Sequence, residues 1–363
     1  MNPWRRAPAV VYSLLFASGA LVFGQDVGFG TSTPDVFGGT NDYRVTVLVS
    51  NEEDEAPVVD PLLRNAWGIA RSPQGPWWVA NNFTNTSTVY TGDGTKLGLE
   101  PSVSGGPTGT VFNNSSSFQM AQDKPAAFLF ASLDGTFSAW NGDVNPNAVV
   151  VHTSPGSVYT GLAIHGDTLY TTDFAECSVE AFRGNFFDGS FDEVELSGDF
   201  PAEVPDGFCP FNVKAIGNSV YVTYAKVGED GEEEHGVGLG YVRQFDLNGN
   251  FVAKVASGNP LNAPWGIAKA PADWGRFSSC VIIGNFGDGM ITGWCPGQKH
   301  KTRYRFGGFL RDKGDKIVID GLWGLGFGNG HLAGPQNVLF FAAGPDEEVN
   351  GYFGKIVFHP ATD

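Results

Sequence analysis

Short hydrophobic runs recur along the chain, and several of them open with a similar phrase. Residues 65–70 read N-A-W-G-I-A, residues 262–268 read N-A-P-W-G-I-A, and residues 320–326 read D-G-L-W-G-L-G. Each phrase leads into a run of strand length, a turn, and a second run in which hydrophobic and polar positions alternate. Short runs of this kind between turn residues are typical of β-strands. The pattern therefore predicts a repeating chain built almost wholly from strands.

Six such units can be aligned, spaced about 40 to 60 residues apart, which is the range of β-propeller blades. A small residue recurs at the start of each unit's first strand, at Gly68, Gly109, Gly161, Asn212, Gly266 and Gly324. Glycine there would let the innermost strands crowd together at a common axis. Each unit also offers a second and a third strand. The runs assigned to outermost strands include S-V-S-G (102–105) in unit one and K-I-V-I (316–319) in unit five.

The sixth unit reaches the end of the chain one strand short. Residues 43–50, Y-R-V-T-V-L-V-S, alternate like a strand and belong to no other unit. If they complete the last blade, the ring closes and no exposed strand edge remains. The sequence therefore predicts an all-β, six-bladed β-propeller over residues 43–363, with four-stranded blades.

Composition agrees with this fold and adds a targeting segment. The 363 residues include 50 glycines and 22 prolines, as expected of a chain that turns often. Arg5 and Arg6 precede an apolar run, which predicts a secretory signal peptide over 1–24 and a flexible lead-in over 25–42. A membrane anchor is the alternative, but the run is short for a span and no stop-transfer segment follows. We expect a secreted, extracellular monomer without stable membrane insertion.

The net charge of −17 would become about −19 once Arg5 and Arg6 are removed. Such a chain is a poor partner for nucleic acid, whose phosphates require a basic surface. Acidic clusters at 52–55, 229–234 and 346–348 are predicted on one face. We call this the top face, where the innermost strands begin and the second strands end. The clusters would attract cations or basic partners, or they only keep the protein soluble.

In a secreted chain the four cysteines are candidates for disulfides. Cys280 and Cys295 fall opposite one another if 278–295 form a hairpin, and Cys177 can reach Cys209 between the third and fourth units. Four free thiols are the alternative. Sequons at Asn82, Asn85, Asn113 and Asn114 are possible glycosylation sites in a eukaryotic source.

The predicted second strands end in polar side chains in alternate units. Asn81, Asp173 and Asn285 occupy equivalent positions, and carboxylate and amide oxygens are the ligands that Ca²⁺ prefers. The sequence therefore offers these three residues as a metal site at the upper channel, although Asn and Asp also commonly cap turns. Trp67, Phe211, Trp265 and Trp323 gather at the innermost strands, where they would stack on sugars or wedge the blades together.

Several phrases of the chain resemble a known group. They are N-A-W-G-I-A, W-W-V-A-N-N, F-A-S-L-D-G-T-F-S-A-W-N, V-T-Y-A-K and I-I-G-N-F-G-D-G-M-I. They are similar to an uncharacterised family of secreted, NHL-like six-bladed propellers, over nearly all of the mature chain. The resemblance implies the fold and secretion but no activity. Calcium-dependent lactonases of the gluconolactonase kind share the architecture more distantly, without a motif in common.

No familiar catalytic motif is present, so catalytic residues are not assigned. The primary hypothesis is an extracellular binding or scaffold propeller whose acidic top face meets a small molecule, a glycan or a protein. The alternative is a calcium-dependent lactone or ester hydrolase at the central channel. A quinone-dependent sugar dehydrogenase comes third, because it would need cationic groups converging in the channel and the sequence shows few.

Overall fold

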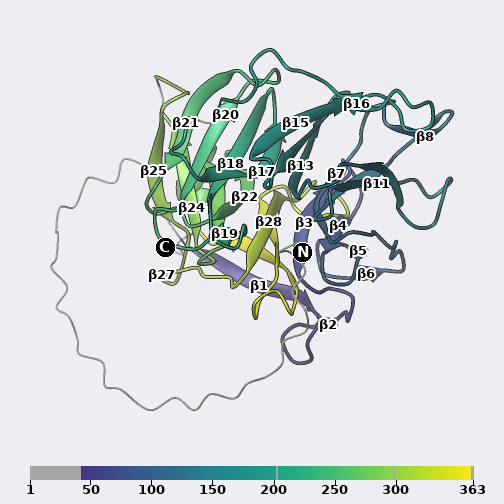
Figure 1. Cartoon of the computed structure of the whole chain (residues 1–363). Coiled ribbons are helices and arrows are strands. Elements are labelled where there is room, and N and C mark those ends of the chain that lie inside the picture. Colours follow the sequence, from purple (N-terminus) through teal and green to yellow (C-terminus); the bar gives the residue numbers. More distant parts are fainter. Residues whose placement is uncertain (1–41, 202, 298, 361–363) are drawn as a thin grey trace.

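The computed structural model describes residues 42–201, 203–297 and 299–360. Six antiparallel sheets surround a common axis, which confirms the predicted all-β, six-bladed propeller (Figure 1). The predicted signal peptide and the lead-in up to residue 41 lie outside the described residues. Within the described part, a 3₁₀ turn, η1 (Gly275–Phe277), is the sole helical element. No helix in those ranges combines the length and hydrophobicity needed to span a membrane.

The innermost strands begin at the top face and run toward the opposite face, which we call the bottom face. They start at or next to the repeated phrases identified in the sequence. In blade order they are β3 (Ala66–Arg71), β7 (Pro107–Phe112), β13 (Tyr159–His165), β17 (Phe208–Ile216), β22 (Pro264–Lys269) and β28 (Leu322–Phe327).

The second and third strands of each blade are largely buried and antiparallel to their neighbours. The second strands are β4 (Trp77–Asn81), β10 (Phe128–Ser132), β14 (Thr168–Asp173), β18 (Ser219–Val227), β23 (Val281–Asn285) and β29 (Val338–Ala343). The third strands are β5 (Thr86–Tyr90), β11 (Thr136–Trp140), β15 (Ser178–Arg183), β20 (Gly240–Phe245), β24 (Ile291–Pro296) and β30 (Tyr352–Phe358).

The outermost strands are more exposed, so the hydrophobic pattern marks them less clearly. They are β6 (Lys96–Leu97), β12 (Val149–Thr153), β16 (Asp192–Glu193), β21 (Phe251–Ser257), β25 (Tyr304–Phe309) and β1 (Tyr43–Ser50). Two assignments from sequence were wrong. In blade one, Ser102 makes only an isolated bridge to Thr86. In blade five, Lys316 belongs to a separate hairpin of β26 (Arg311–Asp312) with β27 (Asp315–Lys316), and Val318 makes only an isolated bridge to Met290, because β25 already occupies the outer edge.

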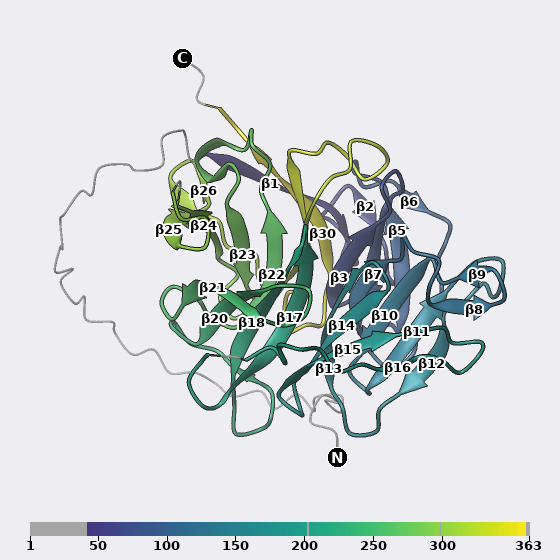
Figure 2. The same cartoon turned by 90° about the horizontal axis from the view of Figure 1, so that it is seen from above.

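Closure of the ring by the first strand is confirmed. The purple strand β1 in Figure 2 pairs antiparallel with β30, from Tyr43 opposite Phe358 to Ser50 opposite Tyr352. A short strand, β2 (Val58–Val59), then adds in parallel to β1. The last blade is thus built from both ends of the described chain, and its outer edge is covered.

The six recurrent small residues meet at the axis. A Cβ on Gly68 would lie 2.4 Å from the carbonyl oxygen of Thr108, and one on Gly109 would lie 2.4 Å from the backbone nitrogen of Leu162. The other axial glycines approach the next blade as closely, and a Cβ on Gly324 in the last blade would lie 2.6 Å from the Trp67 oxygen in the first. A side chain does not fit at these distances, so glycine here sets how closely the blades can pack.

Both predicted disulfides are present. Cys177 and Cys209 join blade three to blade four with a Cα–Cα distance of 4.7 Å. Cys280 and Cys295 lie across the β23–β24 hairpin at 4.2 Å. The remaining short elements are the hairpin of β8 (Gln119–Ala121) with β9 (Lys124–Pro125), and β19 (Glu233–Glu234), which pairs with β18 near the top face.

Candidate functional site

The top end of the channel is closed by a layer of buried side chains. The residue before each axial position contributes to it: Trp67, Thr108, Thr160, Phe211, Trp265 and Trp323, all at most 4% exposed. The rings of Trp67 and Trp323 stack at 3.8 Å, and Phe286 stacks on the other side of Trp323 at 3.7 Å. We call this layer the aromatic plug.

Hydrogen bonds between blades hold the aromatic plug in place. Trp265 Nε1 donates to the carbonyl oxygen of Thr160 at 3.0 Å, and Trp323 Nε1 donates to Asn65 Oδ1 at 3.0 Å. Asn212, the single axial residue that is not glycine, donates its amide to the Trp265 oxygen at 2.7 Å. Because these rings are buried against one another, they wedge the blades together and leave no face for a sugar.

The bottom end of the channel, in contrast, is hollow. A cavity of about 640 Å³ lies between the last halves of the six innermost strands. Its size falls in the range of about 300–1,000 Å³ that is usual for small-molecule sites. Apolar side chains such as Leu162, Ile164, Ile267 and Phe327 share its wall with polar groups in about equal measure. We call this cavity the basic funnel, because of the charges described next.

Three cationic side chains line the basic funnel, and none of its described lining residues is acidic. Lys214 comes from β17, Arg71 from the end of β3 and Lys269 from the end of β22. Burial, and to a lesser extent the charge of Arg71, lowers the pKa of Lys214 to about 8. Burial also lowers the pKa of both Arg71 and Lys269. In a chain of net charge −17, such a cluster of uncompensated cations favours an anionic ligand.

Two of the three cations are fixed by backbone carbonyls. Arg71 donates through Nε to the Phe327 oxygen at 2.7 Å and through Nη2 to the Gly328 oxygen at 3.1 Å. Lys269 donates its ammonium group to the Ser279 oxygen. Within the described ranges Lys214 has no hydrogen bond or ion pair. It also lines a smaller cavity of about 10 Å³ beside the axial glycines, so it stands deepest in the channel.

A second polar group in the same cavity lacks a partner. Thr110 lines both the small cavity and the basic funnel, and its hydroxyl oxygen is buried without a hydrogen bond to the described residues. A buried hydroxyl without a partner costs roughly 1–3 kcal/mol. Because that oxygen is enclosed by its neighbours, the free amine of Lys214 is the group that a bound anion would satisfy.

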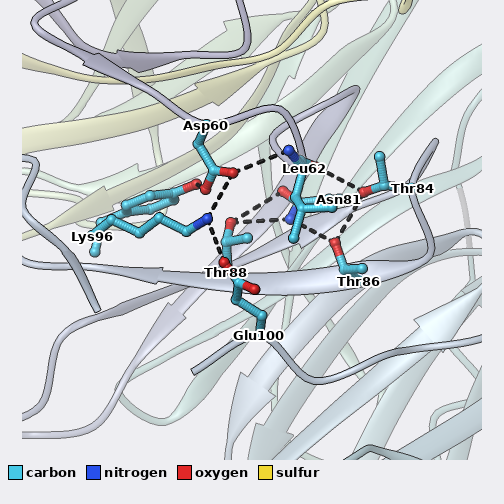
Figure 3. A network of polar contacts seen from close by, with 9 residues as sticks. Asp60, Leu62, Asn81, Thr84, Thr86, Thr88, Lys96 and Glu100 are labelled. Carbon is cyan, nitrogen blue, oxygen red and sulfur yellow. Dashed lines mark hydrogen bonds and ion pairs between the residues drawn. The ribbon is translucent and has the colours of Figure 1, made fainter. Parts of the chain in front are cut away.

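The proposed metal residues lie one strand further from the axis, each within its own blade. Asn81 is fully buried in the polar network of Figure 3, where its amide donates to Thr86 at 3.1 Å and to Thr88 at 3.0 Å. The same network holds Asp60, which accepts from Lys96 at 2.8 Å and from the backbone of Leu62. Asn81 thus has local partners in blade one.

Asp173 and Asn285 are also fully buried, and each keeps one oxygen free. Asp173 Oδ1 accepts from three backbone nitrogens, those of Val158, Ala175 and Glu176, while Oδ2 has no partner. Asn285 donates to the Pro260 oxygen and to Asp288, while its Oδ1 has no partner. These backbone contacts show that Asp173 caps a turn, which is the other role expected for Asn and Asp at these positions. The described residues contain no group of three or more His, Cys, Asp and Glu side chains arranged for a metal.

The three acidic clusters do follow strands that end at the top face, as expected from sequence. Ser50 precedes residues 52–55, Val227 precedes 229–234 and Ala343 precedes 346–348. At their centre, His235 Nε2 lies 3.6 Å from Glu233, and its ring packs edge-on against Phe286 of the aromatic plug. The hydrogen bond to Glu233 raises the pKa of His235, and the charges of Glu348 and Asp288 add to the effect.

The candidate glycosylation sites differ in exposure. Asn85 and Asn114 are exposed, and Asn82 is partly buried. Asn113 is buried and donates its amide to the oxygens of Ser117 and Ala126, both at 3.0 Å. That nitrogen would have to leave both bonds before it carried a glycan. Asn114 also lines the rim of the basic funnel.

Sequence comparison finds relatives of this chain in a giant virus of amoebae, Acanthamoeba polyphaga mimivirus. It is 33% identical over 331 residues to uncharacterised protein R648 of Acanthamoeba polyphaga mimivirus, an alignment that covers 86% of this chain and 80% of the relative. It is 32% identical over 335 residues to uncharacterised protein L690 of the same virus, covering 87% and 86%. The chain belongs to the R648–L690 family. No family model matches the sequence.

Solved structures similar to this member of the R648–L690 family show its fold alone. A streptogramin B lyase superposes with a TM-score of 0.50 at 12% identity, covering 87% of this chain and 97% of the lyase. A putative oxidoreductase (glucose dehydrogenase) from Thermus thermophilus gives 0.51 at 11% identity, covering 87% and 100%. At these identities the likeness supports the propeller and carries no activity over to the R648–L690 family.

The basic funnel was missed from sequence, where few cations were expected in the channel. A signal was nevertheless present. Two residues after the axial position, five units carry Ala70, Val111, Ala163, Ala268 and Gly326, whereas unit four carries Lys214. The same unit replaces the axial glycine with Asn212. A lysine at a position that is otherwise small or apolar in the repeat therefore distinguishes blade four from the other five blades.

Proposed function

We propose that this protein is a binding protein for a small anionic molecule, which enters the basic funnel from the bottom face and pairs with Lys214. One observation carries the proposal: a lysine without an ionic partner stands at the deep end of a cavity whose described lining includes no acidic residue. A carboxylate or phosphate group would supply the missing partner, while the apolar part of the wall would take the rest of a small amphipathic molecule.

Secretion remains part of the proposal. The predicted signal peptide and the two disulfides support an extracellular setting, because disulfides persist in oxidising compartments. The ligand would then be an extracellular metabolite. The acidic rim of the top face would serve a separate contact, with a basic partner, as the sequence suggested.

A thermal-shift screen with small carboxylates and phosphates tests the proposed function. At least one anion should raise the melting temperature of the wild-type protein by mass action. Lys214→Met should abolish the shift, and Lys214→Arg should keep much of it because the charge is retained. Lys301→Met is the matched control, since Lys301 is exposed and does not line the basic funnel. If no anion stabilises the protein, or if Lys214→Met responds like the wild type, the proposed function is wrong.

A second candidate function is lactone or ester hydrolysis, which would depend on a divalent cation bound near the top of the channel. The observation in its favour is that buried Asp173 and Asn285 each keep one unpaired oxygen. Burial and the nearby charge of Asp173 also raise the pKa of Glu180 to about 7, and a cation would relieve that repulsion. Elemental analysis before and after chelation, with Asp173→Ala alongside, decides it. One equivalent of calcium that the variant loses would justify an ester and lactone screen; a protein without metal would end this candidate.

A further inference from the structure

Lys214 differs from an ordinary anion-binding lysine in its surroundings. It has no ionic partner among the described residues, and the other charged side chains that line the basic funnel, Arg71 and Lys269, are both cationic. Burial and the Arg71 charge disfavour the ammonium form, so its pKa falls to about 8. An amine with such a pKa is unprotonated in part of the molecules at neutral pH, and an unprotonated amine is a nucleophile.

The cavity offers what a carbonyl compound would need beside that amine. Arg71 is held at the wall by the oxygens of Phe327 and Gly328, so its remaining N–H groups are placed to meet an anionic group. Apolar residues such as Ile267 and Leu325 line another part of the wall.

We propose that Lys214 forms a reversible imine with a small aldehyde or ketone that carries a carboxylate or phosphate, and that this carbonyl class is the ligand of the basic funnel. The inference rests on the proposed function, because the anionic group must first bring the carbonyl to the amine.

The chemistry needs no further reactant. The nitrogen lone pair of Lys214 attacks the carbonyl carbon, and a C–N bond forms as the carbonyl π bond opens and its oxygen takes up a proton. The nitrogen loses a proton, the new hydroxyl group takes up a second proton and leaves as water, and the nitrogen lone pair forms the C=N bond as the C–O bond breaks. Loss of the last N–H proton gives the neutral imine, so the two protons that the oxygen gains match the two that the amine loses. Carbon and nitrogen keep their combined oxidation level, and addition of water reverses the reaction.

Trapping with a reductant tests the inference. The wild-type protein is incubated with glyoxylate and sodium cyanoborohydride, which reduces an imine to a stable secondary amine, and then mapped by peptide mass spectrometry. We expect one label per chain, on Lys214, formed about tenfold faster than on exposed lysines because more of this amine is unprotonated. The rate of labelling should rise between pH 6 and pH 8. Acetaldehyde lacks the anionic group, so it should label Lys214 more slowly than glyoxylate does, whereas the two aldehydes should differ less at the exposed Lys301.

Two variants and one further ligand separate the inference from the proposed function. Lys214→Arg should lose the label while it still binds succinate, an anion without a reactive carbonyl, in the thermal-shift assay. Lys301→Met should label like the wild type. If succinate stabilises the protein but glyoxylate labels Lys214 no faster than the exposed lysines, the imine is wrong and anion binding stands. If neither glyoxylate nor succinate interacts with Lys214, both proposals fail.

Discussion

At the scale of single residues, the environment of one lysine gives the channel its chemistry. Lys214 occupies a place where the other blades carry small or apolar side chains, and the desolvation it experiences is not offset by a carboxylate among the described lining residues. Sequence reveals that the residue type is unusual at this point of the repeat. It does not reveal that the side chain lines a cavity and is unpaired, because both depend on how six separate strands converge.

Anion binding should depend on pH through Lys214. Its pKa is lowered to about 8, mainly by burial, so the ammonium form is present below pH 8 and lost above it. The affinity for a non-reactive anion such as succinate should therefore fall as the pH rises from 7 to 9. Lys214→Arg should show no such fall, since arginine stays charged throughout. Isothermal titration at several pH values measures this, and a flat profile for the wild type would contradict it.

His235 should stabilise the fold only at low pH. Its hydrogen bond to Glu233 raises its pKa above the usual 6.5, so the stabilisation is fully present below pH 6.5 and disappears as the pH passes the raised pKa. His235→Gln should thus lower the melting temperature at pH 5 more than at pH 8.5. The exposed His331, replaced in the same way, should show no such difference. Equal losses for His235→Gln at both pH values would exclude the ionic contribution.

At the scale of elements, the closure of the ring was predicted from sequence, and so were the outermost strands β12, β16 and β21 of blades two to four. Residues 43–50 alternate clearly because the blade buries one of their faces, and the structure gives β1 the same bounds. The outermost strands of blades one and five were misplaced, since little burial constrains their pattern. β6 has two residues, and β25 is largely exposed or half-buried. The Cys280–Cys295 pair could be predicted because hairpin geometry sets the two residues opposite each other, and the Cys177–Cys209 pair because both strands begin near the same face of the ring.

Asp60 should act as a latch between the last blade and the first. It follows β2, on the edge of the last blade, and accepts from Lys96 of the first blade (Figure 3). It also accepts from the hydroxyl of Tyr90 in the same blade. Asp60→Ala should cost about 1–3 kcal/mol, because the buried Tyr90 hydroxyl loses its acceptor while Lys96 keeps its pair with Glu100.

Urea denaturation of the latch variant measures that cost. The matched control is Asp143→Ala, which breaks an exposed pair with Lys124 and should cost at most about 1 kcal/mol. Similar losses in the two variants would mean that Asp60 does not latch the ring.

At the scale of the whole molecule, six blades pack around an axis that has room for backbone only. The aromatic plug fills one end of the channel, and the basic funnel remains open at the other. The repeat predicted the axial residues correctly, because close approach leaves a direct signature in glycine. From sequence, a ligand was expected at the top face by analogy with other propellers. The cavity described here lies at the bottom face instead, where the bulky residues of the aromatic plug are absent.

Gly109→Ala should test the axial packing. The new Cβ would lie 2.4 Å from the backbone nitrogen of Leu162 in the next blade, so the blades must separate. We expect a loss of about 1–3 kcal/mol in the free energy of unfolding. Gly98→Ala is the control, because nothing lies within 4 Å of the added carbon. Calorimetry of both variants measures the difference, and equal stability would contradict the packing described here.

The most direct test of the account is a crystal structure of the protein with the anion that stabilises it best in the thermal-shift screen. The account predicts density for that molecule in the basic funnel, with a carboxylate or phosphate oxygen within hydrogen-bond distance of Lys214 Nζ. An anion bound on the top face, or a basic funnel filled only with solvent at saturating ligand, would contradict it.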